Sequence, residues 1–219
     1  MMVNCCMKIH SRTLLILGAT IFILIFSLTF LAQFFILTTY AQIEQDESAT
    51  NVQRVLDHIQ FDQEGLTNNA RDWAIWDESY RFMEEPNAQF QTSTIEPESV
   101  YESLHINGLF YYNRSGGLVA GSWYDLNNRI HTVPPDDLLT FLSIRRGLLQ
   151  NVSGGGDTGV VFLSERPALI SLQPILPSSG TGPSLGTLVM VRMYDDPRIA
   201  DMEQSTSLPI HLTRFNGGS

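Results

Sequence analysis

The stretch LLILGATIFILIFSLTFLAQFFIL, residues 14–37, separates a short N-terminal tail from a long polar region. No charged residue occurs between Arg12 and Glu44. As a helix, this stretch would span about 36 Å, which exceeds the roughly 30 Å of a bilayer's hydrocarbon core. A helix buried in a soluble protein rarely stays apolar on every face for that length. We therefore predict a transmembrane helix at 13–39, preceded by a tail at 1–12.

The charges on either side of the apolar stretch predict its orientation. Lys8 and Arg12 precede it, whereas a group of acidic residues begins at Glu44. Positively charged flanks stay in the cytoplasm. We therefore expect a single-pass protein of the cell inner membrane, with a cytoplasmic N-terminus and a periplasmic or extracellular domain. A cleaved signal peptide is the alternative, since residues 39–41 offer a small-x-small site. Signal peptides, however, have apolar regions of only about 7–15 residues.

The composition excludes several classes of function. The chain carries 23 acidic and 13 basic residues, for a net charge of −10, and every acidic residue follows the apolar stretch. An acidic domain lacks the positive surface that nucleic acid requires, so we expect no nucleic-acid partner. Both cysteines, Cys5 and Cys6, precede the apolar stretch, which excludes a disulfide or a thiolate site in the domain. The histidines show no metal-ligand spacing, so we expect neither a metal nor a cofactor.

The region 40–82 predicts a long membrane-proximal helix. Apolar residues recur there at spacings of three, four and seven, with one gap in the repeat, at Asp62. Gly65 lowers the helix propensity locally, so a break near 61–66 is an alternative to one continuous helix.

The first half of this helix predicts a dimer. Val52, Val55 and Ile59 form a narrow apolar edge on a helix that is otherwise polar. A helix that protrudes from its domain can bury such an edge only against a partner. We therefore expect residues 43–62 to pair with a second copy of the chain as a homodimer.

The following residues, 83–215, predict a sheet with helices packed on it. Runs rich in β-branched and aromatic residues, separated by turn signals, predict five strands, at 104–112, 118–124, 159–164, 168–175 and 185–193. The other expectations are a loop at 86–99, a helix at 136–150, a short helix from Asp196, a weak strand at 207–213 and a flexible C-terminus at 216–219. Because hairpins join most of the strands, the fold class is α+β with a five-stranded antiparallel sheet.

The densest cluster of reactive side chains lies at the end of the long helix. Asp72, Trp73, Trp76, Asp77 and Tyr80 fall within two and a half turns. Aromatic rings beside carboxylates can enclose a cationic ligand, and a purely structural cluster is the alternative. The two carboxylates diverge by about 140° around a helix and cannot easily share one substrate. We therefore predict a ligand-binding role and no catalysis.

Asp77 falls between Trp73 and Tyr80 on the apolar face of the predicted helix, where a carboxylate needs a partner. Alternation along 188–193 places Arg192 on the buried face of the last strand. We therefore predict that Asp77, or Asp72 beside it, pairs with Arg192, and we include Arg192 among the ligand-binding candidates.

The motif Asp-Trp-Ala-x-Trp-Asp-x-x-Tyr-x-Phe at 72–82 resembles the signature of the CHASE domain, type four. The similarity extends upstream to Glu44 and the Asn-Val-x-Arg at 51–54. It extends downstream to the hairpin at 113–121 and the strand motifs at 174–176 and 186–192. It covers about 40–215. The resemblance implies a PAS- or Cache-like antiparallel sheet and a sensory role outside the membrane.

Domains of this type usually lie between two membrane spans and control a histidine kinase, diguanylate cyclase or phosphodiesterase. Within these 219 residues we expect no second span and no output module. We expect a receptor input domain that responds to an unknown small-molecule signal, with the lipid bilayer and a downstream kinase or cyclase module as partners. A stand-alone tethered binding or adaptor protein is one alternative, and an exported enzyme is another.

Overall fold

The computed structural model describes residues 3–150, 152, 154–163 and 166–213. The chain divides into two compact units, Met1–Gln53 and Arg54–Ser219, which we consider separately.

The described residues of the first unit are all helical and belong to α1 (Val3–Ala74). Its most apolar window is Leu17–Phe34, with a mean hydropathy of 2.1. All side chains in this window face outward, and Phe22, Phe26 and Phe30 stack along one side. A helix that is apolar on all faces and packs against nothing in its own chain has the length and composition to cross a membrane.

The alternative of a break near 61–66 is wrong. Gly65 lies within α1, and a side chain there would meet no atom within 4 Å. The helix instead ends at Ala74, because Trp76 adopts an extended backbone with φ −139° and ψ 131°. The predicted helix 40–82 is therefore two helices, the second being α2 (Asp77–Glu84).

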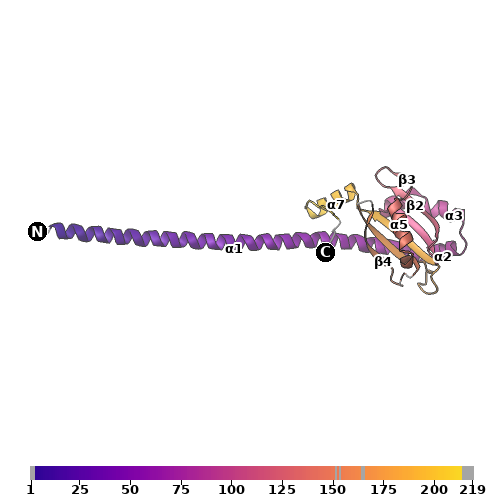
Figure 1. Cartoon of the computed structure of the whole chain (residues 1–219), viewed down its shortest axis with the longest axis horizontal. Helices are drawn as coiled ribbons and strands as arrows, with labels where there is room; N and C mark the ends of the chain where they lie inside the picture. The colour runs from indigo at the N-terminus through magenta and orange to yellow at the C-terminus, as the bar shows by residue number, and fades with distance from the viewer. Residues whose placement is uncertain (1–2, 151, 153, 164–165, 214–219) are drawn as a thin grey trace. The chain divides into compact units, whose positions relative to one another are not determined.

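The second unit is built on a six-stranded antiparallel sheet, confirming the predicted fold class (Figure 1). The strand order is β3-β2-β1-β6-β5-β4. Their bounds are β1 (Gly108–Asn113), β2 (Leu118–Asp125), β3 (Ile130–Thr132), β4 (Asp157–Leu163), β5 (Arg166–Pro174) and β6 (Gly186–Met193). The prediction of five strands omitted β3, an edge strand whose three residues are all exposed and therefore show no apolar alternation.

The remaining helices are α3 (Ala88–Phe90), the π-helix η1 (Gln91–Ile95), α4 (Glu98–Leu104), α5 (Asp136–Ile144), α6 (Arg146–Gln150) and α7 (Asp196–Thr206). The predicted loop at 86–99 was wrong, because it contains α3, η1 and the start of α4. The predicted helix at 136–150 is divided at Arg145 into α5 and α6. Residues 207–213 form no strand.

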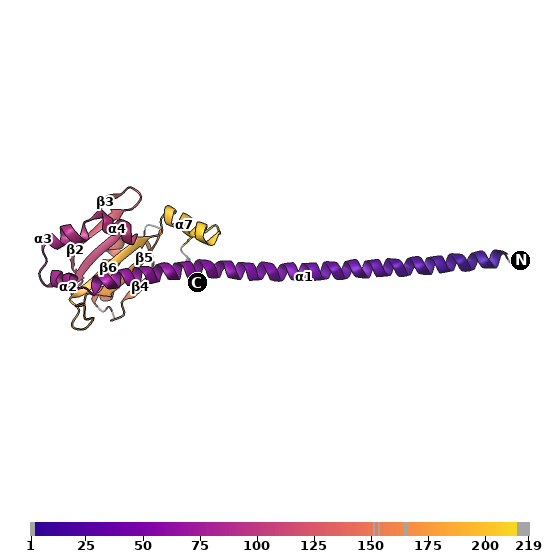
Figure 2. The same cartoon turned by 180° about the vertical axis from the view of Figure 1, so that it is seen from behind.

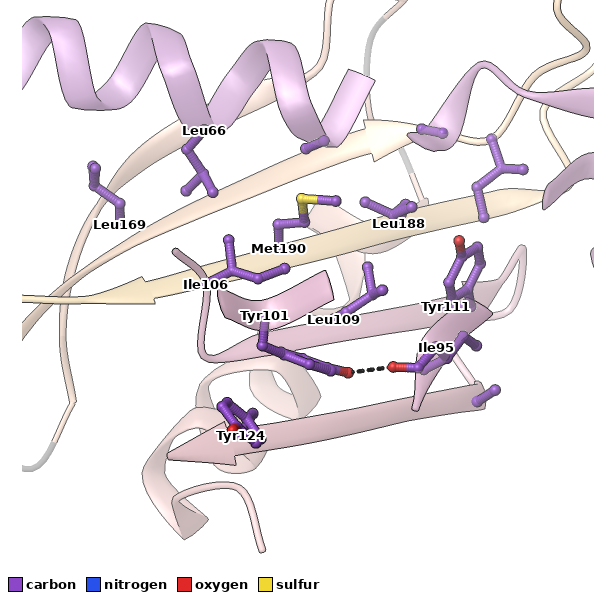
Figure 3. Packing of buried hydrophobic residues seen from close by; sticks show 14 of the residues in the cluster. Leu66, Ile95, Tyr101, Ile106, Leu109, Tyr111, Tyr124, Leu169, Leu188 and Met190 are labelled. Carbon is purple, nitrogen blue, oxygen red and sulfur yellow. Dashed lines mark hydrogen bonds between the residues drawn. The ribbon is translucent and has the colours of Figure 1, made fainter. Parts of the chain in front are cut away.

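Helices cover both faces of the sheet. The end of α1 lies over one face with α2, α3 and α4 (Figure 2), whereas α5 lies over the other (Figure 1). Two cores result. The first joins Leu66 and Ala70 of α1 to Leu188 and Met190 of β6 (Figure 3), and the second joins α5 and α6 to the opposite face. Because both faces are covered, β6 is buried along almost its whole length.

Candidate functional site

The motif at 72–82 forms the junction between α1 and α2. Ile75 makes an isolated parallel bridge with Leu176, just after β5. The amide of Leu176 donates to the carbonyl of Ala74 at 3.0 Å. This backbone pairing explains why the helix ends at Ala74 even though its sequence remains helical in pattern.

Asp77 lies at this junction on the surface, as the first residue of α2. Its Oδ1 accepts the amide of Ser178 at 2.9 Å, and its own amide donates to Ser178 Oγ at 3.0 Å. The hydroxyl of Tyr80 donates to the carbonyl of Pro183 at 3.2 Å. The two side chains therefore hold the hairpin between β5 and β6.

The aromatic residues of the motif pack against the core. Trp73 and Trp76 meet edge to face at 6.3 Å between ring centroids, and Trp76 lies 6.1 Å from Phe90. Both tryptophans are half-buried, whereas Asp72 is exposed. The break after Ala74 places Asp72 on α1 and Tyr80 on α2, so the predicted cluster does not lie on one helix. These contacts favour a structural role for the motif, and its ligand-binding role stays a prediction.

Arg192 lies on the buried face of β6, as predicted, but its predicted partner is wrong. Within the described part of the chain, its guanidinium pairs with Asp62 of α1, with 3.7 Å between Nη1 and Oδ1. Neither Asp72 nor Asp77 forms an ion pair with it there. Asp62 is the gap in the apolar repeat of α1. A charged residue inside such a repeat was the signal for a buried ion pair.

Arg192 joins three elements at this point. Its Nε donates to His105 O and its Nη2 to Leu104 O, both at 2.9 Å, at the C-terminal end of α4. Its Nη1 donates to the carbonyl of Asp62 at 3.3 Å. Burial, followed by the nearby charge of Arg198, lowers the pKa of Arg192, and Asp62 opposes this shift. The guanidinium holds α4 and α1 to the sheet.

Arg198 supplies a second guanidinium to the same carboxylate. It lies in the first turn of α7, where its Nη2 pairs with Asp62 Oδ1. Asp195 caps that helix by accepting the amide of Arg198 at 3.2 Å. Further along α7, Met202 is buried in the core and Ser205 Oγ lies 3.3 Å from His58 Nδ1 of α1. The helix therefore packs along α1.

Three buried side-chain atoms in the described part of the chain make no hydrogen bond of good geometry to another protein atom, and all belong to this cluster, where the hydroxyl of Tyr194 nevertheless interacts with Asp62. They are Asp62 Oδ2, Tyr194 Oη and Arg198 Nε. Burial raises the pKa of Tyr194, and the charge of Asp62 raises it further. We call Asp62, Arg192, Tyr194 and Arg198 the Asp62 cluster.

A cavity of about 420 Å³ opens beside the Asp62 cluster. Its lining combines charged and apolar side chains from α4, the turn after β2, β6 and α7, and consists of Glu102, His105, Leu126, Asn127, Arg129, Arg192, Met193, Asp195, Pro197, Arg198 and Asp201. Of the six predicted site residues, Arg192 alone lines it. Sequence reasoning missed Arg198, which has no periodic signal because α7 is short and polar.

Two of the carboxylates in the cavity wall already have partners. Glu102 pairs with Arg129 at 2.8 Å, which lowers the pKa of that carboxyl. Asp195 accepts from Asn127 Nδ2 at 2.8 Å in addition to its capping bond. No cluster of three or more His, Cys, Asp or Glu among the described residues has the arrangement to hold a metal ion. The cavity suits a small polar organic molecule.

A cluster of three aromatic side chains joins α4, β2 and β3. The rings of Tyr101, Tyr124 and His131 contact one another at 5.1 to 5.4 Å between centroids. The hydroxyl of Tyr101 donates to Ile95 O at 2.8 Å (Figure 3), and burial raises its pKa to about 12. These tightly packed rings leave α4 fixed against β2.

Residues 58–213 match the model of the CHASE4 domain. Among curated proteins, the chain is similar to the methanogenesis regulatory histidine kinase FilI of Methanothrix harundinacea (strain 6Ac). The two are 24% identical over 174 residues, which cover 80% of this chain and 20% of that protein. The chain thus spans about a fifth of the length of this relative.

Two solved structures are also similar. One is the extracellular domain of a protein described as a histidine kinase, vpHK1S-Z8, at 15% identity and a TM-score of 0.42, covering 66% of this chain and 59% of that one. The other is a domain of a sensory box/GGDEF family protein from Vibrio parahaemolyticus, at 15% identity and a TM-score of 0.43, covering 66% and 62%. The family match confirms the resemblance carried by residues 72–82 and indicates a sensory domain. The chain belongs to the CHASE4 domain family.

Proposed function

We propose that this chain is the membrane-anchored, outward-facing sensory part of a signalling receptor. The observation that carries the proposal is the position of Asp62. The helix that contains this residue, α1, also contains the apolar window Leu17–Phe34. The carboxylate pairs with Arg192 of β6 and Arg198 of α7, both at the cavity. A ligand in that cavity can therefore act on α1 through two ion pairs.

The arrangement along the chain follows from this proposal. Residues 1–12 form a cytoplasmic tail and 13–39 the membrane span, since Lys8 and Arg12 precede the span and acidic residues follow it. The sensory domain then lies outside the membrane. The FilI relative is named a histidine kinase, and we propose a kinase module as the output partner of this chain.

A homodimer through α1 is part of the proposal, with an edge that differs in part from the one predicted. Val55 and Ile59 pack against the core of their own unit, so they are not free to face a partner. Val52 of the predicted edge is 61% exposed, and Leu56 on the same helix is 52% exposed. These exposed apolar side chains are the ones that a second copy would cover.

Reporter fusions test the orientation. Alkaline phosphatase joined after Ser219 should be active and a green fluorescent protein at the same site dark, because the first folds only outside the cytoplasm and the second only inside. The same two reporters joined after Arg12, ahead of the apolar window, serve as the matched control and should give the reverse result. A dark phosphatase and a bright fluorescent protein after Ser219 would refute the proposed function.

A further inference from the structure

The Asp62 cluster is unbalanced in both charge and hydrogen bonding. One carboxylate, Asp62, faces two guanidiniums, Arg192 and Arg198. Of the three buried atoms described above, Arg198 Nε has no protein partner among the described residues, whereas the hydroxyl of Tyr194 and the carboxylate of Asp62 interact with each other. Buried polar atoms in native proteins nearly always have a partner, and exceptions gather at functional sites. Within this cluster the imbalance is one positive charge, whereas the cavity wall as a whole balances three arginines against three acids, Arg129, Arg192 and Arg198 against Glu102, Asp195 and Asp201.

We propose that this cavity binds a small organic carboxylate, and that the guanidinium of Arg198 receives the carboxylate group. The proposal rests on the sensory function proposed above and assigns the chemical class of the signal. The planar guanidinium of arginine can donate two parallel hydrogen bonds to the two oxygens of a carboxylate, which makes a bidentate ion pair.

The guanidinium of Arg198 has hydrogen-bond donors that a ligand could use, whereas that of Arg192 does not. Arg192 is only 6% exposed and donates to three backbone carbonyls as well as facing Asp62. The side chain of Arg198 is 23% exposed, and its Nε has no partner. Rotation of this side chain toward the cavity would bring Nε and a terminal nitrogen to a ligand together. The first turn of α7, in which it lies, also favours an anion.

The rest of the cavity wall favours an organic anion over an inorganic one. Leu126, Met193 and Pro197 supply an apolar surface, and a volume of about 420 Å³ is larger than a phosphate or sulfate ion needs. Glu102 is compensated by its ion pair with Arg129, and Asp195 accepts two hydrogen bonds from neutral donors. Asp201 also lines the wall, so the carboxylate group of a ligand is favoured at Arg198 and not over the wall as a whole.

Binding would change the contact between α7 and α1. A carboxylate ligand competes with Asp62 for Arg198, while Arg192 keeps its own pair with Asp62. The charge of Asp62 therefore stays compensated when Arg198 turns away. In this exchange Arg198 of α7 gives up its ion pair with Asp62 of α1 and pairs with the ligand instead. No buried charge is left unpaired.

Ligand binding to the full chain in lipid nanodiscs tests the proposal. The probes are acetate, succinate and citrate, with acetamide and succinamide as uncharged controls and inorganic phosphate as the non-organic anion. We expect at least one of the carboxylates to raise the unfolding temperature saturably and to bind by calorimetry, and the amides and phosphate to do neither.

Variants then locate the site. Arg198→Gln should weaken binding at least tenfold, whereas Arg81→Gln, an exposed arginine of α2, should leave it unchanged. Should Arg198→Gln fail to fold, Arg198→Lys keeps the charge for Asp62 but removes the planar guanidinium, and it should also bind more weakly than the wild type. The proposal is overturned if no carboxylate binds the folded wild type, if phosphate binds as well as succinate, or if the folded Arg198 variants bind as the wild type does. Any of these results leaves the reporter-fusion test of the sensory function unaffected.

Discussion

The carboxylate of Asp62 on α1 lies 3.7 Å from the guanidinium of Arg192 on β6, and both side chains are at most 7% exposed. This pair takes the place of the predicted pair between Asp77 and Arg192. It lies about three helical turns before the end of α1, so the helix is held to the sheet at a second place besides the junction at Ala74. The two attachments together fix the last part of α1 on the sheet.

The close pairing of β1 and β6 predicts a strong effect at Gly186. A Cβ atom there would lie 1.9 Å from the carbonyl oxygen of Tyr112, a backbone atom that cannot move without breaking the strand pairing. We expect Gly186→Ala to lower the free energy of unfolding by about 3 kcal/mol. Gly159→Ala in β4 is the matched control, because a Cβ there meets nothing within 4 Å. Equal denaturation midpoints for the two variants would contradict the register of β6.

The exposed position of Asp77 predicts a modest effect of its removal. Asp77→Ala loses the hydrogen bond to the Ser178 amide and a favourable charge at the start of α2, and should lower the free energy of unfolding by about 1 kcal/mol. A buried ion pair would give about 3–5 kcal/mol instead. Chemical denaturation of Asp77→Ala beside Glu78→Ala, its exposed neighbour, separates the two. A loss in the larger range would restore the predicted burial of Asp77.

The buried hydroxyl of Tyr101 predicts a loss of stability at high pH. Burial raises its pKa in the folded state to about 12, from about 10 in the unfolded state. Between these values the folded protein binds more protons than the unfolded one, so stability is complete below pH 10 and falls as the pH rises toward 12. The maximum loss from this group is about 3 kcal/mol. Urea unfolding of the wild type and Tyr101→Phe at pH 9 and pH 11 measures it, and the wild type should lose more. Equal losses would show that Tyr101 does not titrate in this way.

The exposed apolar residues of α1 predict a specific cross-link. With Cys5 and Cys6 replaced by serine, Leu56→Cys should form a disulfide-linked dimer in oxidised membranes, because Leu56 is 52% exposed. Ile59→Cys should not, because Ile59 packs against the core of its own chain. Gel electrophoresis without reducing agent gives the readout. Strong cross-linking at position 59 and none at 56 would favour the edge predicted from the sequence.

Much of the fold follows from local patterns in the sequence. The apolar stretch, the five longer strands and the helix start at Asp136 were each predicted from periodicity or turn residues. The alternation of β6 also placed Leu188, Met190 and Arg192 on one face correctly. Local patterns act over a few residues, and these elements depend on nothing more distant.

The elements that were missed depend on tertiary contacts. The end of α1 at Ala74 results from pairing with Leu176, about a hundred residues away in sequence. The partner of Arg192 was misassigned because helical periodicity was extended across this break, which put Asp77 on a face that ends before it. The charged gap at Asp62 was visible in the sequence, but its meaning required knowing which residues of β6 and α7 lie opposite.

The central claim is that buried charge at Asp62 holds α1 to the sheet, and a double-mutant cycle with Arg192 tests it most directly. Asp62→Ala and Arg192→Ala should each lower the free energy of unfolding of the full chain by about 3–5 kcal/mol, because each leaves a buried charge with fewer partners. Glu64→Ala, an exposed acid on the same helix, should change it by less than about 0.5 kcal/mol. The double variant should lose less than the sum of the single losses, by about 1–3 kcal/mol. Additive losses, or a loss for Asp62→Ala no larger than for Glu64→Ala, would contradict the account.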